Sequence, residues 1–244
     1  MPSLVWERLP QEAYDNPYEY AVQDQFVREA TLWLSEIRTL LNKSNLLFHI
    51  NDNSLEKATW MLAQDLVDSL MEVKILIGEK RHRVASRIFR DCVETIDLLH
   101  FLHSPSNEKT QTLESWYGNQ TVKHGELRKH IEIAEGTVAA KKRRAFYDEL
   151  SKFTHRTYMS LLHSYSLGRE SLMVNDTYSE TGMLVLPHVV ATYLVVLASL
   201  IKEASQVLVI SGAITADEMD IVWKCALDTH TVPRRFSISY RVAP

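Results

Sequence analysis

The sequence contains few of the residues on which a turn-rich fold depends. Only 7 Gly and 7 Pro occur in 244 residues, whereas 45% of the residues are hydrophobic and 24% are charged. Because Gly and Pro form most tight turns, their scarcity disfavours an architecture of many short strands. We therefore expect an all-α fold, and 244 residues are enough for one helical domain with a substantial core.

The chain has only two cysteines, and it has no excess of positive charge. The two cysteines, Cys92 and Cys225, lie in apolar helical patterns, where a buried free thiol is commoner than a disulfide or a metal ligand. This use of cysteine predicts a reducing compartment. The formal net charge of -4 argues against a protein that coats nucleic acid indiscriminately, so any binding of RNA would require a local basic face.

No segment predicts export or a membrane span. The N-terminus lacks the basic start and the apolar core of a secretory signal. The most apolar stretch, 189–201, is followed directly by Lys202 and Glu203 and is too short to cross a bilayer comfortably. We interpret it as a central buried helix and expect a cytoplasmic protein without a membrane partner.

The common motifs for metals and cofactors are missing as well. There is no H-E-x-x-H, no E-x-x-H on two helices, no Gly-rich phosphate loop and no G-x-S-x-G elbow. His100 and His103 are three residues apart and could supply only two of the ligands of a metal site. The sequence thus predicts no cofactor and no metal.

Apolar residues recur at helical spacing in several long segments, which predicts an up-and-down bundle of four to six helices. Residues 51–54 and Thr215 supply N-terminal caps, and Gly78 supplies a stop. Two short helices are expected around Trp116 and Leu127. The long helices are predicted at about 22–40, 54–78, 83–103, 137–165, 188–211 and 216–228.

We expect residues 1–244 to form a single helical domain with two irregular parts. The first is a Pro-containing leader, 1–17. The second is an insertion at 167–187, which suits either a hairpin or an extended loop, with strands at 172–174 and 183–186. The chain shows no internal repeat and no linker that divides it.

Two helices carry polar residues that could form a site. On the predicted helix 83–103, one polar stripe follows three- and four-residue spacing, and it is either a solvated face or an internal strip that lines a cleft. On helix 137–165, Ser151 and His155 border the apolar face, where His155 is either a structural histidine or a titrating group beside a substrate. The stripe comprises Arg83, Arg87, Arg90, Glu94 and Asp97.

Three short blocks, 89–94, 115–118 and 147–155, resemble a bacterial family of helical proteins of unknown function. That family has an R-x-x-x-E helix, a tryptophan after it and a Y-x-x-L-S-x-x-x-H helix. The resemblance implies no activity. It implies one cluster inside a single subunit, formed by Arg90, Glu94, Trp116, Ser151 and His155.

Arg156 and His163 fit a second pattern, R-x(4-6)-H, which is similar to the motif of the HEPN superfamily of helical domains. That resemblance implies a metal-independent ribonuclease, in a toxin or defence setting, with a composite site across a dimer. His163 would act as acid or base, and Arg156 would bind phosphate. Only Thr157 stands where a polar residue is expected beside the arginine. Since His155 and Arg156 point about 100° apart on a helix, the two clusters cannot describe one site.

Two basic segments could contact RNA or remain solvated surface. One is 141–144, Lys-Lys-Arg-Arg, whose four side chains spread around most of a helical turn. The other is the tail with Arg234, Arg235 and Arg241, which could equally dock onto its own protein. We therefore predict a non-catalytic module that binds a partner protein or forms a homodimer; the alternative is a HEPN-type ribonuclease or RNA-binding effector.

Overall fold

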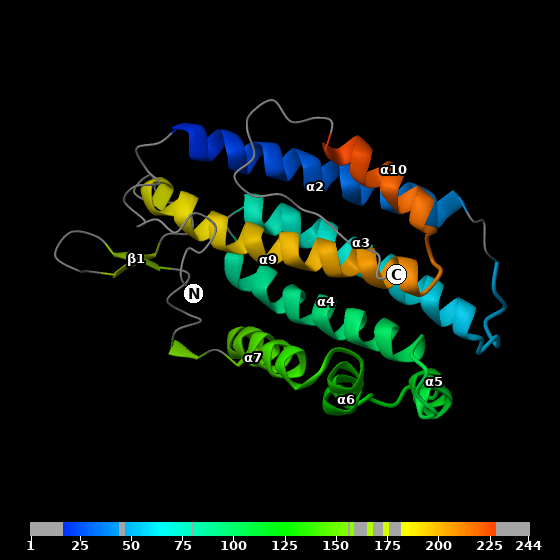
Figure 1. The fold of residues 1–244 in the computed structure, drawn as a ribbon. Coiled ribbons are helices and arrows are strands. Elements are labelled where there is room, and N and C mark those ends of the chain that lie inside the picture. Colours follow the sequence, from blue (N-terminus) through cyan, green and yellow to red (C-terminus); the bar gives the residue numbers. More distant parts are fainter. Residues whose placement is uncertain are drawn as a thin grey trace.

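The computed structural model describes residues 17–43, 47–79, 81–155, 157–158, 165–167, 173–175 and 182–227. Within these ranges the chain forms eight helices (Figure 1), which confirms the all-α class but exceeds the predicted four to six. The bundle number left out the two short helices expected around Trp116 and Leu127, which are present as α5 and α6. The helices are α2 (Pro17–Lys43), α3 (Leu55–Gly78), α4 (His82–Leu102), α5 (Lys109–Tyr117), α6 (His124–Glu135), α7 (Thr137–Thr154), α9 (Gly182–Ile210) and α10 (Ala216–Leu227).

Side-chain caps determine where α3 and α10 begin. Ser54 is the N-cap of α3, and its Oγ accepts a hydrogen bond from the backbone N–H of Lys57 at 3.2 Å. Thr215 and Glu218 form a reciprocal capping box before α10, in which each side chain accepts from the other residue's backbone N–H. Both starts agree with the cap residues in the sequence.

Apolar packing holds the long helices together. Helices α2, α3 and α4 alternate in direction, and α9 packs against all three (Figure 1). Helix α10 covers α2, where the rings of Trp33 and Trp223 lie 6.1 Å apart. The largest fully buried side chains come from α2, α3, α4, α7 and α9, and include Trp33, Leu66, Leu70, Phe89, Leu99, Leu150 and Leu197.

Helix α9 takes the central position that its apolar sequence predicted. Its segment Tyr193–Ile210 is long and apolar enough to cross a membrane by length and composition alone. The core helix of a soluble protein passes the same test, and 56% of this segment is buried. Both cysteines are free: Cys92 is buried as expected, but Cys225 is exposed on α10, so its predicted burial was wrong.

Three short helices form a layer beside α4 (Figure 1). Helices α6 and α7 form a hairpin, and both pack on α4. Gly136 joins them with φ +87°, a backbone conformation that glycine adopts without strain. This layer brings charged residues of α6 and α7 against the polar stripe of α4.

Helix α7 ends much earlier than predicted. It stops at Thr154 instead of near residue 165, and the backbone N–H of Thr157 bonds the carbonyl of Lys152 outside the helical pattern. The Thr154 and Thr157 hydroxyls also bond carbonyls of the last turn, a local competition that favours termination. Apolar periodicity alone did not reveal this stop.

The predicted insertion also differs in its second half. Strands β1 (Tyr165–Leu167) and β2 (Met173–Asn175) pair in antiparallel register, with Ser166 opposite Val174. The strand predicted at 183–186 was wrong, because these residues belong to the first turns of α9. The leader 1–16 and the tail 228–244 lie outside the described residues.

Candidate functional site: a polar network between two cavities

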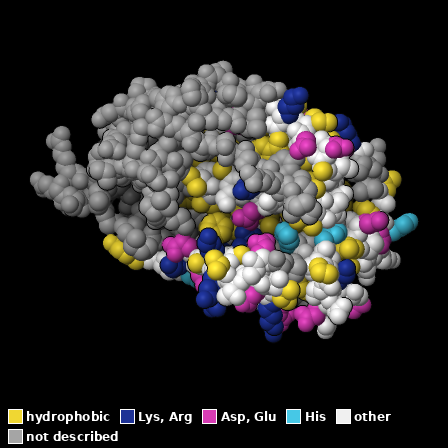
Figure 2. All heavy atoms as spheres, in the orientation of Figure 1, with side chains coloured by type: hydrophobic (Ala, Val, Ile, Leu, Met, Phe, Trp, Pro, Cys, Tyr) yellow, Lys and Arg dark blue, Asp and Glu magenta, His cyan; other side chains and the backbone are white. Residues whose placement is uncertain are grey.

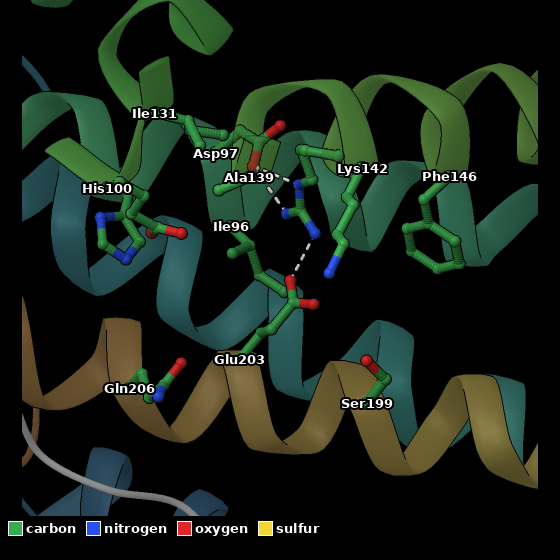
Figure 3. A pocket seen from close by; sticks show the side chains of 12 residues that line it. Ile96, Asp97, His100, Ile131, Ala139, Lys142, Phe146, Ser199, Glu203 and Gln206 are labelled. Atoms are coloured by element: carbon green, nitrogen blue, oxygen red, sulfur yellow. Dashed lines mark hydrogen bonds and ion pairs between the residues drawn. The ribbon is translucent and has the colours of Figure 1, made fainter. Parts of the chain in front are cut away.

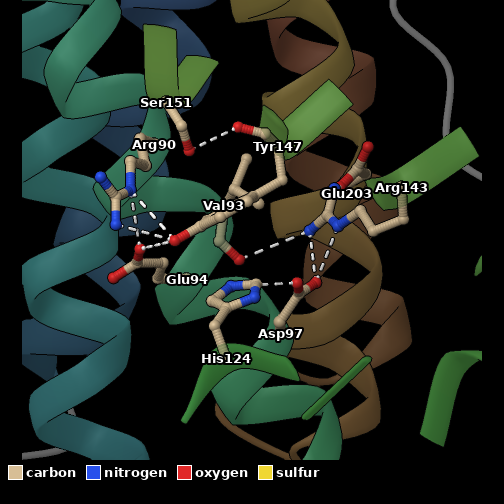
Figure 4. A network of polar contacts seen from close by, with 9 residues as sticks. All are labelled: Arg90, Val93, Glu94, Asp97, His124, Arg143, Tyr147, Ser151 and Glu203. Carbon is tan, nitrogen blue, oxygen red and sulfur yellow. Dashed lines mark hydrogen bonds and ion pairs between the residues drawn. The ribbon is translucent and has the colours of Figure 1, made fainter. Parts of the chain in front are cut away.

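The polar stripe of α4 faces α7 through Arg90 and Glu94 (Figure 4). The Nε of Arg90 donates to Oε1 of Glu94 at 2.9 Å, and the same oxygen accepts the hydroxyl of Tyr147 at 2.7 Å. Arg90 also donates to the Tyr147 hydroxyl and, at 3.1 Å, to Oγ1 of Thr154. These contacts attach the end of α7 to α4. Burial is the main cause that raises the pKa of Tyr147, with the Glu94 hydrogen bond second, so the phenol is neutral at physiological pH.

A second set of ion pairs connects α4, α7 and α9 through Arg143. Its Nη2 lies 2.6 Å from Oδ1 of Asp97, and its Nη1 bonds the carboxylate of Glu203 (Figure 4). The side chains of Asp97 and Arg143 are only 3% and 10% exposed, and that of Glu203 is 31% exposed. Burial raises the pKa of Glu203, although the Arg143 guanidinium opposes that shift. Arg143 therefore holds two carboxylates that would otherwise repel each other.

His124, the first residue of α6, lies between these two sets. Its ring stacks on Tyr147 with centroids 4.3 Å apart, and its Nε2 is 3.3 Å from Oδ2 of Asp97. Arg128, one turn later, places its guanidinium 4.6 Å from the same Tyr147 ring. Burial is the largest influence on the pKa of His124 and lowers it, more than the nearby Asp97 carboxylate raises it. The imidazole is therefore neutral at physiological pH.

A cavity of about 360 Å³ opens beside Arg143, between α4, the α6–α7 hairpin and α9 (Figure 3). Acidic, basic and histidine side chains gather on this part of the surface, between α9 and the short helices (Figure 2). The wall also has an apolar part. The cavity is lined by Ile96, Asp97, His100, Ile131, Glu135, Ala139, Lys142, Arg143, Phe146, Ser199, Glu203 and Gln206.

A second cavity, of about 380 Å³, lies between α4, α5 and α6 and is lined in part by His124. Glu94 and Trp116 reach this cavity, so two members of the cluster implied by the bacterial family meet there. The histidine that lines this cavity with them is His124, whereas the predicted cluster contained His155. The full lining is Leu62, Glu94, Thr95, Leu98, Trp116, Asn119, Gln120, Thr121, Val122, His124 and Leu127.

The other members of that predicted cluster have different surroundings. The hydroxyl of Ser151 donates to the backbone carbonyl of Tyr147, one turn earlier in α7, at 2.9 Å. His155 is exposed and caps the C-terminus of α7, where its backbone N–H bonds the carbonyl of Ser151. Neither side chain lines the two cavities. A catalytic role for either residue stays a prediction.

The residues of the HEPN-like motif, Arg156 and His163, lie outside the described residues, so their proposed roles also stay predictions. The four residues of the basic segment 141–144 have different surroundings in the fold. Lys141, Lys142 and Arg144 are exposed, whereas Arg143 points inward to its two carboxylates.

The geometry supports attachment of helices better than acid or base chemistry. Glu94 and Asp97 are each bound to an arginine, and Ser151 bonds the backbone. Across the described ranges, no group of three or more His, Cys, Asp or Glu side chains could hold a metal ion. His103, one of the two histidines considered as metal ligands, is hydrogen-bonded to the hydroxyl of Thr59, with Nε2 and Oγ1 2.8 Å apart.

Sequence reasoning missed His124 and Arg143, which join the parts of the network. No local signal marks His124, since Asp97 is 27 positions away in the chain (124 − 97). Arg143 was considered only as one of the four basic residues 141–144, and nothing in that segment distinguishes it from its neighbours. No family model, curated protein or solved structure matches the chain, and what the sequence and structure establish is an all-α protein in which a buried polar network joins α4, α6, α7 and α9.

Proposed function

We propose that this chain is a non-catalytic helical module that forms a homodimer through the loop between α2 and α3. One observation carries the proposal: Leu47 and Ile50 in this loop are 97% and 89% exposed. A single exposed aliphatic residue is ordinary on a protein surface. Two of them on one short loop form an apolar projection whose exposure to water is unfavourable and whose burial against a partner lowers the free energy.

Hydrogen bonds hold the described part of this loop, residues 47–54. The Nζ of Lys57 donates to the backbone carbonyls of His49, Ile50 and Asp52, at 3.0, 2.8 and 2.7 Å. Asp52 accepts from both the backbone N–H and the hydroxyl of Ser54. Because residues 49–54 are already hydrogen-bonded in the folded chain, they have little conformational entropy left to lose when a partner binds.

A second copy of the chain is the partner that this surface fits. The rings of Phe48 and Trp60 lie 5.8 Å apart and are partly exposed, and Phe48 is the neighbour of Leu47 in the chain. A two-fold interface requires a patch that complements itself. Here the aliphatic projection of one copy can pack on the aromatic surface of the other. Met61, in the second turn of α3, is a further apolar residue that is 42% exposed.

Sedimentation equilibrium of the full chain over a wide concentration range tests this proposal. A monomer has a mass of 28.1 kDa, and we expect a reversible transition to twice that mass. The double variant Leu47→Ser/Ile50→Ser should weaken the dimer at least about tenfold, because burial of each aliphatic side chain contributes about 1.5 kcal/mol or more.

Ile133→Ser is the matched control, because Ile133 is 85% exposed but lies on α6, away from the loop. It should dimerise like the wild type. A wild type that stays monomeric, or a double variant that dimerises unchanged, would show that the loop is not a dimer contact.

An RNA-directed function is the second candidate, and the exposed cations of α7 favour it. Lys141, Lys142 and Arg144 all reach solvent and could contact phosphate. Incubation of a mixed RNA pool with purified protein in chelator tests the predicted ribonuclease. Cleavage that His163→Ala abolishes and His155→Ala leaves intact would support the HEPN-like assignment, whereas an intact RNA pool with folded wild type would count against it.

A further inference from the structure

The cavity beside Arg143 has charges of both signs at its opening. On α7, Lys142 and Phe146 are one turn apart and point toward α9 (Figure 3). On α9, Ser199 and Glu203 are also one turn apart and lie across from them (Figure 3). The opening therefore presents an ammonium group and an aromatic ring on one side, and a hydroxyl and a carboxylate on the other.

Each of the two charges at the opening can accept a further partner. Glu203 bonds Arg143 through one carboxylate oxygen, and its other oxygen has no hydrogen-bond partner among the described residues. Lys142 is exposed and forms no ion pair within the described ranges. Arg143, by contrast, already binds Asp97 and Glu203. A ligand would consequently pair its cation with Glu203 and its anion with Lys142.

The interior of the cavity is apolar on the side of α4 and the α6–α7 hairpin. Ile96, Ile131, Ala139 and Phe146 form this part of the wall. A volume of about 360 Å³ is at the lower end of ligand pockets, which start near 300 Å³. It suits a small ligand with one apolar group better than an extended chain.

We infer that this cavity binds a small zwitterion with an apolar side chain, of the kind that a free amino acid provides. Its ammonium pairs with Glu203 and the hydroxyl of Ser199, its carboxylate pairs with Lys142, and its apolar group packs on Phe146 and Ile131. A cation at the free oxygen also counteracts the burial that raises the pKa of Glu203. None of these residues belongs to the α2–α3 loop, so the inference does not depend on the proposed dimer.

Isothermal titration calorimetry with three related probes tests this assignment. Phenylalanine carries both charges, phenethylamine lacks the carboxylate and phenylpropanoate lacks the ammonium. We expect phenylalanine to bind at least about fivefold more tightly than either analogue, since each analogue loses one ion pair. Equal affinity for the three probes, or no heat of binding with any of them, would overturn the inference.

Two variants assign the charges to their residues. Lys142→Gln should lower the affinity for phenylalanine to that for phenethylamine, and Glu203→Gln should lower it to that for phenylpropanoate. Lys141→Gln is the control, because Lys141 is an exposed neighbour that does not line the cavity. Glu203→Gln also disturbs the bond to Arg143, so its thermal melting is compared with wild type. Lys142 has no such structural contact, and unchanged binding by Lys142→Gln would refute the assignment by itself.

Discussion

The two sides of α4 are held by different physical interactions. On one side, α2, α3, α9 and α10 pack through apolar side chains such as Trp33 and Leu197, both fully buried. On the other side, α6 and α7 each bury a leucine, Leu127 and Leu150, and are further attached through hydrogen bonds, ion pairs and contacts to the Tyr147 ring. Apolar packing is non-directional and tolerates small shifts, whereas a buried ionic network stabilises only when each partner is in place. The α6–α7 layer should therefore be the part that responds to single polar substitutions and to pH.

Trp33→Ala should produce the largest loss of stability. It would show how much the apolar packing on this side of α4 contributes to the free energy of unfolding. Trp33 is fully buried on α2 and contacts Trp223 on α10. Truncation of a buried tryptophan leaves a cavity and typically costs about 3–5 kcal/mol. Urea unfolding measures the effect, with Val138→Ala, at a 69% exposed position, as the control. A loss below about 1 kcal/mol would contradict the central role of this contact.

Arg143→Ala should be the most damaging polar substitution. It leaves the buried Asp97 carboxylate without its cation, which we expect to cost about 3 kcal/mol. Hydrogen exchange should accelerate in α6 and α7 before it does in α2 and α3. Arg144→Ala is the neighbouring control, because Arg144 is 75% exposed and its ion pair contributes little. Similar losses for the two variants would remove the distinction between the two sides of α4.

Tyr147→Phe should have a smaller effect, because it keeps the aromatic ring and removes only the hydroxyl. That hydroxyl donates to Glu94 and accepts from Arg90, so we expect a loss of about 1–2 kcal/mol. Tyr158→Phe, at a 69% exposed position, should change stability by less than about 0.5 kcal/mol. Urea unfolding of both variants compares them directly; equal stability would show that packing of the ring alone attaches α7.

The pH dependence of stability should provide the smallest and most specific effect. Burial lowers the pKa of His124 below its ordinary value of 6.5, with Arg128 and Arg143 adding to the shift and Asp97 and Glu94 opposing it. As the pH falls through 6.5, the unfolded chain binds a proton that the folded chain resists, so the free energy of unfolding decreases. This decrease continues until the pH reaches the lower pKa of the folded state.

His124→Gln removes that titration and isolates its contribution. Urea unfolding between about pH 7.5 and pH 5 should show a steeper loss of stability for wild type than for His124→Gln. The raised pKa of Glu203 acts in the opposite direction, because the folded state then takes up a proton more readily than the unfolded chain. Since Glu203 is present in both proteins, the difference between them reports His124. Parallel pH profiles would mean that the imidazole titrates as it does in an unfolded chain.

Local sequence signals predicted much of the helical framework. The caps at Ser54 and Thr215 and the apolar spacing of α2, α3 and α4 all correspond to helices close to the predicted bounds. These features depend on residues within one or two turns of each other, and such information is contained in any short window of the chain. The early end of α7 was missed because its last turn is bonded by Thr154 and Thr157 and attached to Arg90 on another helix.

The sequence by itself determined the all-α class, the central position of the apolar helix α9 and the polar stripe on α4, because each follows from composition or periodicity. Only the tertiary structure decided which polar residues meet. It turned Arg143 inward to Asp97 and Glu203 and brought His124, rather than His155, beside Tyr147. These partners come from four helices and are up to 106 positions apart (203 − 97), so their contacts depend on how the helices pack. Helical periodicity shows which face a side chain occupies, and packing alone determines what that face contacts.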